Sequence, residues 1–410
     1  RPVVFSAGVP STFLTNFRAS LEFLEQLEKY CLTRQSLNAF RSSTIMSAFL
    51  KRWNTSVYFT LRFQEIAGAL DQALGSFTLN KVESKKGGQF AMSATTVVWE
   101  CLEKCWADEI FLPALSDRFL KLALQLLSRY QGWLVSGISA RTAALNSQLS
   151  GAGGAPPSTP PPAGVPQKST AGDWTAGSSA EELAMVRHDA ECLADLVEGS
   201  YTATVELTLA HLPPPAISGI RDAFSQGAVK LRAVLPDIDA LCTTSVVDKC
   251  VEVLKQMRGI TATYRMTNKP LPTRHSHFVP SILGPLKTFI SGDQAHGMSE
   301  VAQGKLVRAV AEQVTEKYDG MANDLVNTIR KTEMSLKRLK GRRDTKAAAG
   351  AQSGEALSDT DKICHQLLLD VQEYGRQLSQ VGVAPESVSS YERLSETVNP
   401  TKEGPPTAAQ

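Results

Sequence analysis

The chain has 410 residues, of which 42% are hydrophobic and 20% are charged, and its formal net charge is +2. This length and composition suit a soluble globular protein of two to three domains, and the near-neutral balance excludes a general attraction to nucleic acid or membranes. Seven scattered cysteines describe no disulfide framework, so we expect a reducing compartment. The most apolar stretch, residues 119–138, contains Lys121 and Arg129 and should not span a bilayer. Since the chain begins at Arg1 without a signal pattern, we expect a cytosolic fragment of a longer protein.

Breaks in composition divide the chain. Residues 147–180 are dense in Gly, Pro, Ala, Ser and Thr, a composition that buries too little apolar surface to offset the entropy of ordering. We therefore expect a helical bundle over 1–146, a disordered linker over 147–180 and a second helical bundle over 181–398. The second bundle should contain a loop near 341–357, which is rich in Ala, Gly and Lys, and a disordered tail should follow over 399–410.

Outside these breaks, apolar residues recur at steps of three and four, the period of an α-helix. Two series stand out in the first segment: Leu14, Phe17, Leu21, Leu24 and Leu27, and then Leu115, Phe119, Leu122, Leu126, Tyr130 and Trp133. Leu120, Leu124 and Leu127 give the later series a second apolar face, which is typical of a buried helix.

One segment is compatible with two structures. Val57, Phe59, Leu61 and Phe63 alternate with polar residues, as in a strand. The wider window also fits a helix, through Trp53, Val57, Leu61, Ile66 and Leu70. We favour the helix because no partner strand is visible nearby, but the pattern alone leaves the strand open.

The second segment begins with a capping box, Ser179 followed by Glu182, which satisfies two free amides at a helix start. That helix should continue to the stop at Pro213–Pro215. Further helical series cover residues 238–257, 307–339 and 363–381, and Gly382 is placed to end the last one. The pattern as a whole predicts an all-α fold.

Sequence motifs for catalysis are missing: the chain has no phosphate-binding loop, no nucleophile elbow and no His-Glu-x-x-His helix. Cys101 and Cys105 could share a helix face, and His275 with His277 could add nitrogen ligands. However, about 170 residues separate the pairs, whereas a zinc site usually combines closely spaced ones. We favour packing for the cysteines and solvation for the histidines, and we predict no catalytic, cofactor-binding or metal-binding residue.

A basic cluster is the one anomaly in the charge pattern. It comprises Arg330, Lys331, Lys337, Arg338, Lys340, Arg342 and Arg343. These cations could be a solvated helix end, where they favour the negative pole of the helix dipole. Alternatively they could bind an acidic partner surface or anionic lipid. Nucleic acid is less favoured, because no aromatic residues are interleaved with the charges.

Several stretches resemble the family of subunit 2 of the conserved oligomeric Golgi complex. In the first segment these are Phe5–Pro10, Phe49–Asn54, Val57–Gly68 and Cys105–Pro113, which leads into Arg129–Tyr130. After the linker they are Tyr264–Pro270, Ser335–Lys340, Ser358–Ile363 and Leu369–Val371. The resemblance runs in order over nearly the whole chain except the linker, while the family's amino-terminal coiled-coil region is absent.

The resemblance implies helical bundles stacked into a rod, without catalysis or a cofactor. It implies a vesicle-tethering subunit for retrograde intra-Golgi transport and Golgi organisation, peripheral on the cytosolic face of Golgi membranes with a soluble cytoplasmic pool. The implied partners are the other subunits of that complex, with vesicle-fusion proteins or the Golgi membrane surface as further candidates, and neither nucleic acid nor a small-molecule substrate. The alternatives are a helical scaffold or adaptor of another trafficking pathway, and an enzyme with an unrecognised site.

Overall fold

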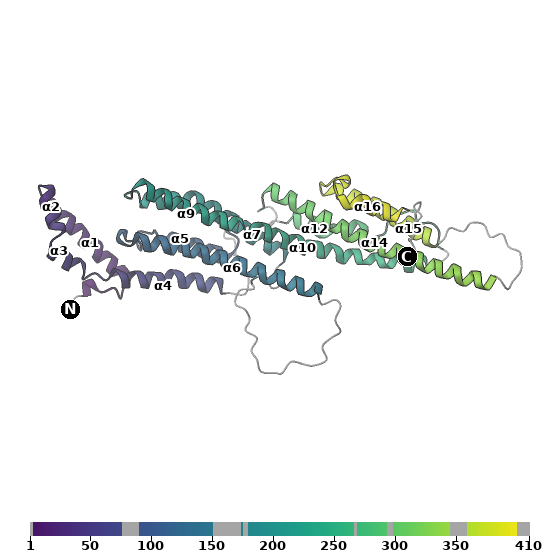
Figure 1. Ribbon diagram of the computed structural model, residues 1–410, viewed down its shortest axis with the longest axis horizontal. Helices are drawn as coiled ribbons and strands as arrows, with labels where there is room; N and C mark the ends of the chain where they lie inside the picture. The colour runs from purple at the N-terminus through teal and green to yellow at the C-terminus, as the bar shows by residue number, and fades with distance from the viewer. Residues whose placement is uncertain are drawn as a thin grey trace, which may run out of the picture. The chain divides into compact units, whose positions relative to one another are not determined.

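The computed structural model describes residues 3–75, 90–150, 174, 179–265, 269–292, 298–344 and 359–399. Within these ranges the regular secondary structure is helical and no β-strand occurs (Figure 1), so the prediction of an all-α fold is confirmed. The chain forms two compact units. Residues 1–178 and 185–238 make up the first unit, and residues 179–184 and 239–410 make up the second.

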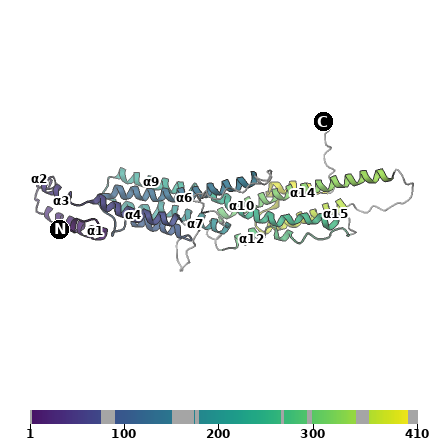
Figure 2. The same ribbon diagram turned by 90° about the horizontal axis from the view of Figure 1, so that it is seen from below.

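The first unit is built around a bundle of helices that pack in sequence. Its helices are α1 (Pro10–Glu28), α2 (Arg34–Arg41), α3 (Thr44–Leu50), α4 (Thr55–Leu74), α5 (Ser93–Lys104), α6 (Ser116–Ser150), most of α7 (Ala180–Leu196), α8 (Thr202–Thr208) and α9 (Pro214–Arg232). Short 3₁₀ turns occur at Val3–Phe5 and Pro113–Leu115. Helix α4 packs on α5, α5 on α6 and α6 on α9, and α6 and α9 run side by side in both views (Figure 1, Figure 2). The residues with the ambiguous pattern, 57–63, lie within α4, which confirms the helix there.

Aromatic side chains form the core at the start of the first unit. The Trp53 ring lies 5.3 Å from the ring of Phe13 and 5.1 Å from that of Phe17, in edge-on geometry. Phe13 also stacks on Tyr58 with ring centroids 5.2 Å apart. Such pairs add about 0.5–1.5 kcal/mol each beyond the area they bury. This cluster fixes the first half of α1 on the start of α4.

Residues after the expected linker pack with the first unit. The buried Asp189 on α7 accepts hydrogen bonds from the backbone amides of Ala91, at 2.9 Å, and of Met92, at 2.8 Å. Met92 precedes α5 and has no side-chain cap there. The carboxylate thus supplies acceptors that the start of α5 lacks. The compact units consequently divide the chain differently from the expected boundary, because residues 185–238 belong with the first unit.

The helix after the linker begins and ends close to the expected positions, with one irregularity. The Ser179 hydroxyl accepts from the amide of Glu182, and the Glu182 carboxylate accepts from the amide of Ser179, which confirms the capping box. Between α7 and α8, Val197–Tyr201 forms a π-helical turn. Such turns insert one extra residue and are frequent at functional sites.

The expected linker, residues 147–180, falls mostly outside the described residues, with exceptions at its start, its end and at Trp174. Helix α6 continues to Ser150, so the first four linker residues are helical. The buried Trp174 ring stacks on Trp133 with centroids 5.2 Å apart, and its Nε1 donates to the Trp133 carbonyl at 3.0 Å. A Cβ atom at Gly137 would lie 2.0 Å from that Nε1. The absence of a side chain at Gly137 therefore makes room for Trp174.

The second unit is assembled around the longest helix. It contains most of α10 (Leu235–Leu254), α11 (Gly259–Tyr264), α12 (Gly284–Ile290), α14 (Glu300–Asp344), α15 (Asp359–Gln380) and α16 (Ser389–Val398), with 3₁₀ turns at Lys255–Arg258, Val279–Ser281 and Pro385–Ser387. Helix α14 packs against α15 and α16. Gly382 follows α15 with φ of 79°, the left-handed conformation that ends a helix. Of the residues where a loop is expected, 341–344 are helical, because α14 continues to Asp344, and 345–357 lie outside the described part.

A second buried aspartate organises this unit. The Asp370 carboxylate on α15 accepts from the Ser276 amide at 2.6 Å, from the Ser276 hydroxyl at 2.7 Å and from the Gln366 side-chain amide at 2.9 Å. One turn further along α15, the Tyr374 hydroxyl lies 2.9 Å from that of Thr315 on α14. The Ser276 contacts hold the irregular segment before the turn at Val279–Ser281 to α15, and the hydroxyl pair joins α15 to α14.

Candidate interaction surfaces

The basic cluster lies at the end of α14, on backbone that is helical to Asp344. Arg330 is half-buried and Lys331 is exposed. The side chains of the other five, Lys337, Arg338, Lys340, Arg342 and Arg343, lie outside the described residues. Binding of an acidic surface by this cluster therefore stays a prediction.

The cysteine and histidine pairs lie in different environments. Cys101 and Cys105 are buried on or directly after α5, where their thiols donate to the carbonyls of Ile66, at 3.4 Å, and of Cys101, at 3.3 Å. Burial raises the pKa of both thiols, which favours the neutral form. His275 and His277 are exposed. Across the described part of the chain, no three His, Cys, Asp or Glu residues are grouped as metal ligands would be.

The polar contacts of the residues between α1 and α4 fix their local structure. The Thr33 hydroxyl and Ser36 form a reciprocal capping box at the start of α2, and Ser43 caps α3. The Arg41 guanidinium donates two hydrogen bonds to Glu28, at 2.7 and 2.6 Å, joining the end of α2 to the end of α1. This pairing lowers the pKa of Glu28.

The same residues bury little apolar surface. Helix α2 contains no buried residue, α3 contains only Met46, and the buried residues of α1 all lie in its first half. Instead, large apolar side chains are exposed between residues 23 and 50: Phe23, Tyr30, Leu32, Ile45 and Leu50. Leu32 is 92% exposed, Tyr30 83% and Ile45 81%. We call residues 23–50 the apolar segment.

An apolar segment of this kind is characteristic of a protein interface, since isolated domains rarely expose large apolar side chains in groups. Tyr and Phe are also enriched in interface cores. The apolar periodicity of the sequence does not mark this surface, although another signal is present. Tyr30 and Leu32 occupy the turn between α1 and α2, where polar turn residues are usual.

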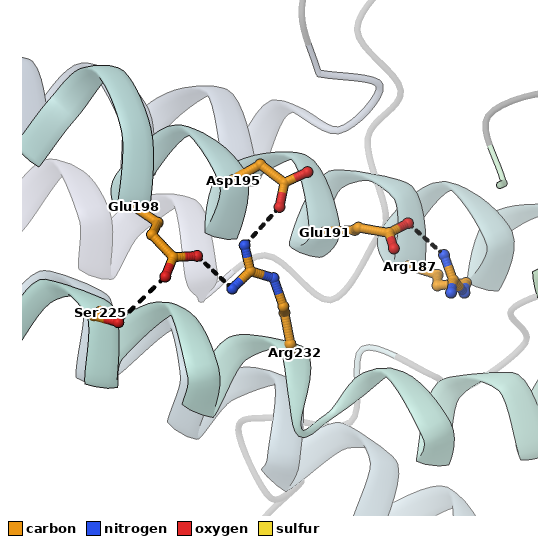
Figure 3. A network of polar contacts seen from close by, with 6 residues as sticks. All are labelled: Arg187, Glu191, Asp195, Glu198, Ser225 and Arg232. Atoms are coloured by element: carbon orange, nitrogen blue, oxygen red, sulfur yellow. Dashed lines mark hydrogen bonds and ion pairs between the residues drawn. The ribbon is translucent and has the colours of Figure 1, made fainter.

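A network of polar contacts links α7, the π-helical turn and α9 of the same unit (Figure 3). The Arg232 guanidinium on α9 donates to Asp195 and to Glu198, both at 2.7 Å, and Glu198 also accepts from the Ser225 hydroxyl at 3.2 Å. This arginine lowers the pKa of Glu198. The network joins α9 to α7 and the π-helical turn, and satisfies charges that would otherwise be available to a partner.

Comparison with known proteins decides the family. A family model described as COG complex component, COG2, C-terminal, matches residues 51–371. The chain belongs to this family. The resemblance found in the sequence is thereby confirmed.

Relatives in distant organisms carry the same description. The chain is 39% identical over 398 residues to the conserved oligomeric Golgi complex subunit 2 of Arabidopsis thaliana, covering 95% of this chain and 50% of the relative. It is 30% identical over 422 residues to the subunit of the same name in Homo sapiens, covering 98% of this chain and 55% of the relative. The chain thus spans about half the length of these relatives. No solved structure matches it, and no described helix is long and apolar enough to cross a bilayer.

Proposed function

We propose that this COG2 family chain is part of a multisubunit Golgi vesicle-tethering complex, which acts in retrograde intra-Golgi transport and Golgi organisation. Family membership supports the assignment to the complex. The exposed apolar segment supports the mode of action. A subunit that functions by binding other subunits needs an apolar surface that is exposed in the free protein and becomes buried in the complex. Each large apolar side chain that becomes buried in an interface contributes about 1.5–3 kcal/mol before ordering costs.

The partners in this proposal are other subunits of the same complex, and vesicle-fusion proteins or the Golgi membrane surface are further candidates. The chain would lie peripherally on the cytosolic face of Golgi membranes, with a cytoplasmic pool. It would act without catalysis, as a scaffold. The basic cluster on α14 is the candidate for an acidic partner or anionic lipid. A helical scaffold of another trafficking pathway is the alternative.

Co-purification tests the proposal. The variant with Tyr30→Ser, Leu32→Ser and Ile45→Ser removes the three most exposed apolar side chains of the segment, so its fold should be unaffected. Introduced into the full-length protein in cells, it should recover other complex subunits in yields lower by roughly fivefold or more. A matched control changes Leu207, Val229 and Val301 to serine, which are also exposed but lie outside the apolar segment. The control should recover normal yields.

Two outcomes would contradict different parts of the proposal. Equal yields from the two triple variants, both with unchanged circular dichroism and melting temperature, would show that the apolar segment does not bind other subunits. Failure of the wild-type protein to recover any subunit of the complex would favour the scaffold alternative.

A further inference from the structure

A second surface of the first unit has different chemistry from the apolar segment. A pocket of 390 Å³ opens between the end of α5 and the π-helical turn. It is lined mainly by Trp99, Glu103 and Trp106 from one side and by Ser200, Tyr201 and Thr204 from the other. We propose that this pocket binds an arginine side chain presented by a partner protein.

The aromatic walls of the pocket are fixed in place. The Tyr201 hydroxyl accepts a hydrogen bond from Trp106 Nε1 at 2.7 Å and donates one to the Leu102 carbonyl at 3.1 Å. The Tyr201 ring lies 5.9 Å from that of Trp99, and the Trp106 ring lies 5.3 Å from that of Phe111. Since the walls are ordered in the free protein, binding does not carry the cost of ordering them.

The position of Tyr201 depends on the irregular helix. Tyr201 is the last residue of the π-helical turn, and its ring also packs edge-on against Phe224 of α9 at 5.3 Å. The extra residue of a π turn changes the direction in which the following side chains leave the helix. This turn thus brings Tyr201 against Trp106 while Ser200 and Thr204 remain exposed at the rim.

The charge of the pocket lining favours a cationic ligand. Glu103 is the charged residue in the pocket lining, it is exposed, and it forms no ion pair with any described residue. It lies close enough to Tyr201 to contribute to the raised pKa of that hydroxyl, after burial and Cys105. Indole and phenol rings attract cations through their faces, and a planar guanidinium can stack on a ring while it donates to a carboxylate. An arginine side chain combines both interactions, and its aliphatic stem suits the apolar walls.

This inference does not depend on the proposed function, because the pocket lies outside the apolar segment and its ligand chemistry is independent of the Golgi assignment. The test uses the 410-residue chain with ¹⁵N-labelled tryptophan. The probe is a capped Gly-Arg-Gly tripeptide, and the comparison probe carries citrulline, which is neutral and nearly isosteric. The arginine peptide should shift the indole signals of Trp99 and Trp106. The citrulline peptide should bind with an affinity at least about fivefold lower.

A matched pair of substitutions locates the site. Glu103→Gln removes the charge in the pocket, and Glu100→Gln removes an exposed charge of the same helix that is not in the lining. Glu103→Gln should weaken arginine binding by about threefold to tenfold, whereas Glu100→Gln should change it less than twofold. Both residues are exposed, so both variants should fold.

Three results would overturn the proposal. The first is a titration to tens of millimolar in which the two indole signals do not move. The second is equal shifts with the arginine and citrulline peptides. The third is equal weakening by Glu103→Gln and Glu100→Gln, which would indicate general attraction between charges on the surface.

Discussion

Each compact unit buries an aspartate on a helix and uses it to hold backbone from a distant part of the chain, but the donors differ. Asp189 in the first unit accepts from two backbone amides, which can only donate. Asp370 in the second unit accepts from one backbone amide, one hydroxyl and one side-chain amide. A hydroxyl can also accept. Equal burial therefore does not mean equal tolerance to substitution.

A threonine–tyrosine pair accompanies each carboxylate. The hydroxyls of Thr95 and Tyr130 lie 3.0 Å apart in the first unit, and those of Thr315 and Tyr374 lie 2.9 Å apart in the second.

The largest effect is expected from Asp189→Asn. Asparagine keeps one acceptor but replaces the other with an NH₂ group, which would face the amide of Ala91 or Met92. One buried donor is then left without a partner, so the free energy of unfolding should fall by about 2–3 kcal/mol. Urea denaturation measures this loss, and hydrogen exchange should become faster at residues 90–96.

Asp370→Asn is the matched control. The asparagine oxygen can still accept from the Ser276 amide, and its NH₂ group can donate to the Ser276 hydroxyl once that hydroxyl reorients. The expected loss is about 1 kcal/mol or less. If Asp370→Asn costs as much as Asp189→Asn, the type of donor does not explain the difference between the units.

The pH dependence separates burial from pairing within the second unit. Burial is the largest cause that raises the pKa of Asp370. For Glu373 on the same helix, hydrogen bonding from Gln377 is the largest cause, and it lowers the pKa. A raised pKa in the folded state gives a stability contribution that is fully present below the ordinary value and is lost as the pH rises through the raised one. A lowered pKa gives a contribution that is present above the ordinary value and is lost as the pH falls.

Unfolding midpoints should accordingly move in opposite directions. Relative to Asp370→Asn, the wild type should lose stability as the pH rises from about 3.8, the ordinary pKa of an aspartate, upward. Relative to Glu373→Gln, it should lose stability as the pH falls below about 4.5, the ordinary pKa of a glutamate. Denaturation series across this range measure both differences. Parallel pH profiles for the two differences would show that burial does not control the ionisation of Asp370.

The sequence predicted what local spacing determines. The steps of three and four located the helices, Ser179 and Glu182 marked a helix start, and Gly382 marked an end. Asp189 and Asp370 could not be found in this way, since their backbone partners lie more than 90 residues away in the chain. A spacing pattern says which residues share a face, but it does not say which distant donor meets that face.

The interaction surfaces show the same limit. Apolar periodicity marks Leu32 or Ile45 as apolar, but only the packing reveals that nothing described covers them. Trp174 lies in a segment whose composition predicts disorder, yet its indole ring stacks on that of Trp133. The pocket depends on Tyr201, whose position requires a π-helical turn. No simple sequence signal distinguishes that turn from continuous α-helix.

The last comparison concerns two buried tyrosines whose rings are in contact. The rings of Tyr318 and Tyr374 are both buried and lie 5.3 Å apart in edge-on geometry. The Tyr374 hydroxyl lies within hydrogen-bond distance of Thr315, whereas the Tyr318 hydroxyl has no partner among the described residues. Removing each hydroxyl by substitution with phenylalanine therefore tests the hydrogen bond while the ring is kept.

Tyr374→Phe should lower the free energy of unfolding by about 0.5–1.5 kcal/mol, the usual net value of a buried hydrogen bond. The Thr315 hydroxyl still donates to the Ala311 carbonyl at 2.7 Å. It loses only the hydrogen bond that it accepts from Tyr374. Tyr318→Phe should raise the free energy of unfolding by up to about 1 kcal/mol, because it removes a buried polar group that lost its hydration without gaining a partner. Urea denaturation of the two variants side by side measures the difference. If Tyr318→Phe destabilises as much as Tyr374→Phe, the Tyr318 hydroxyl has a partner in solution, and a buried water molecule that bridges it to a neighbouring polar group would be the first explanation to examine.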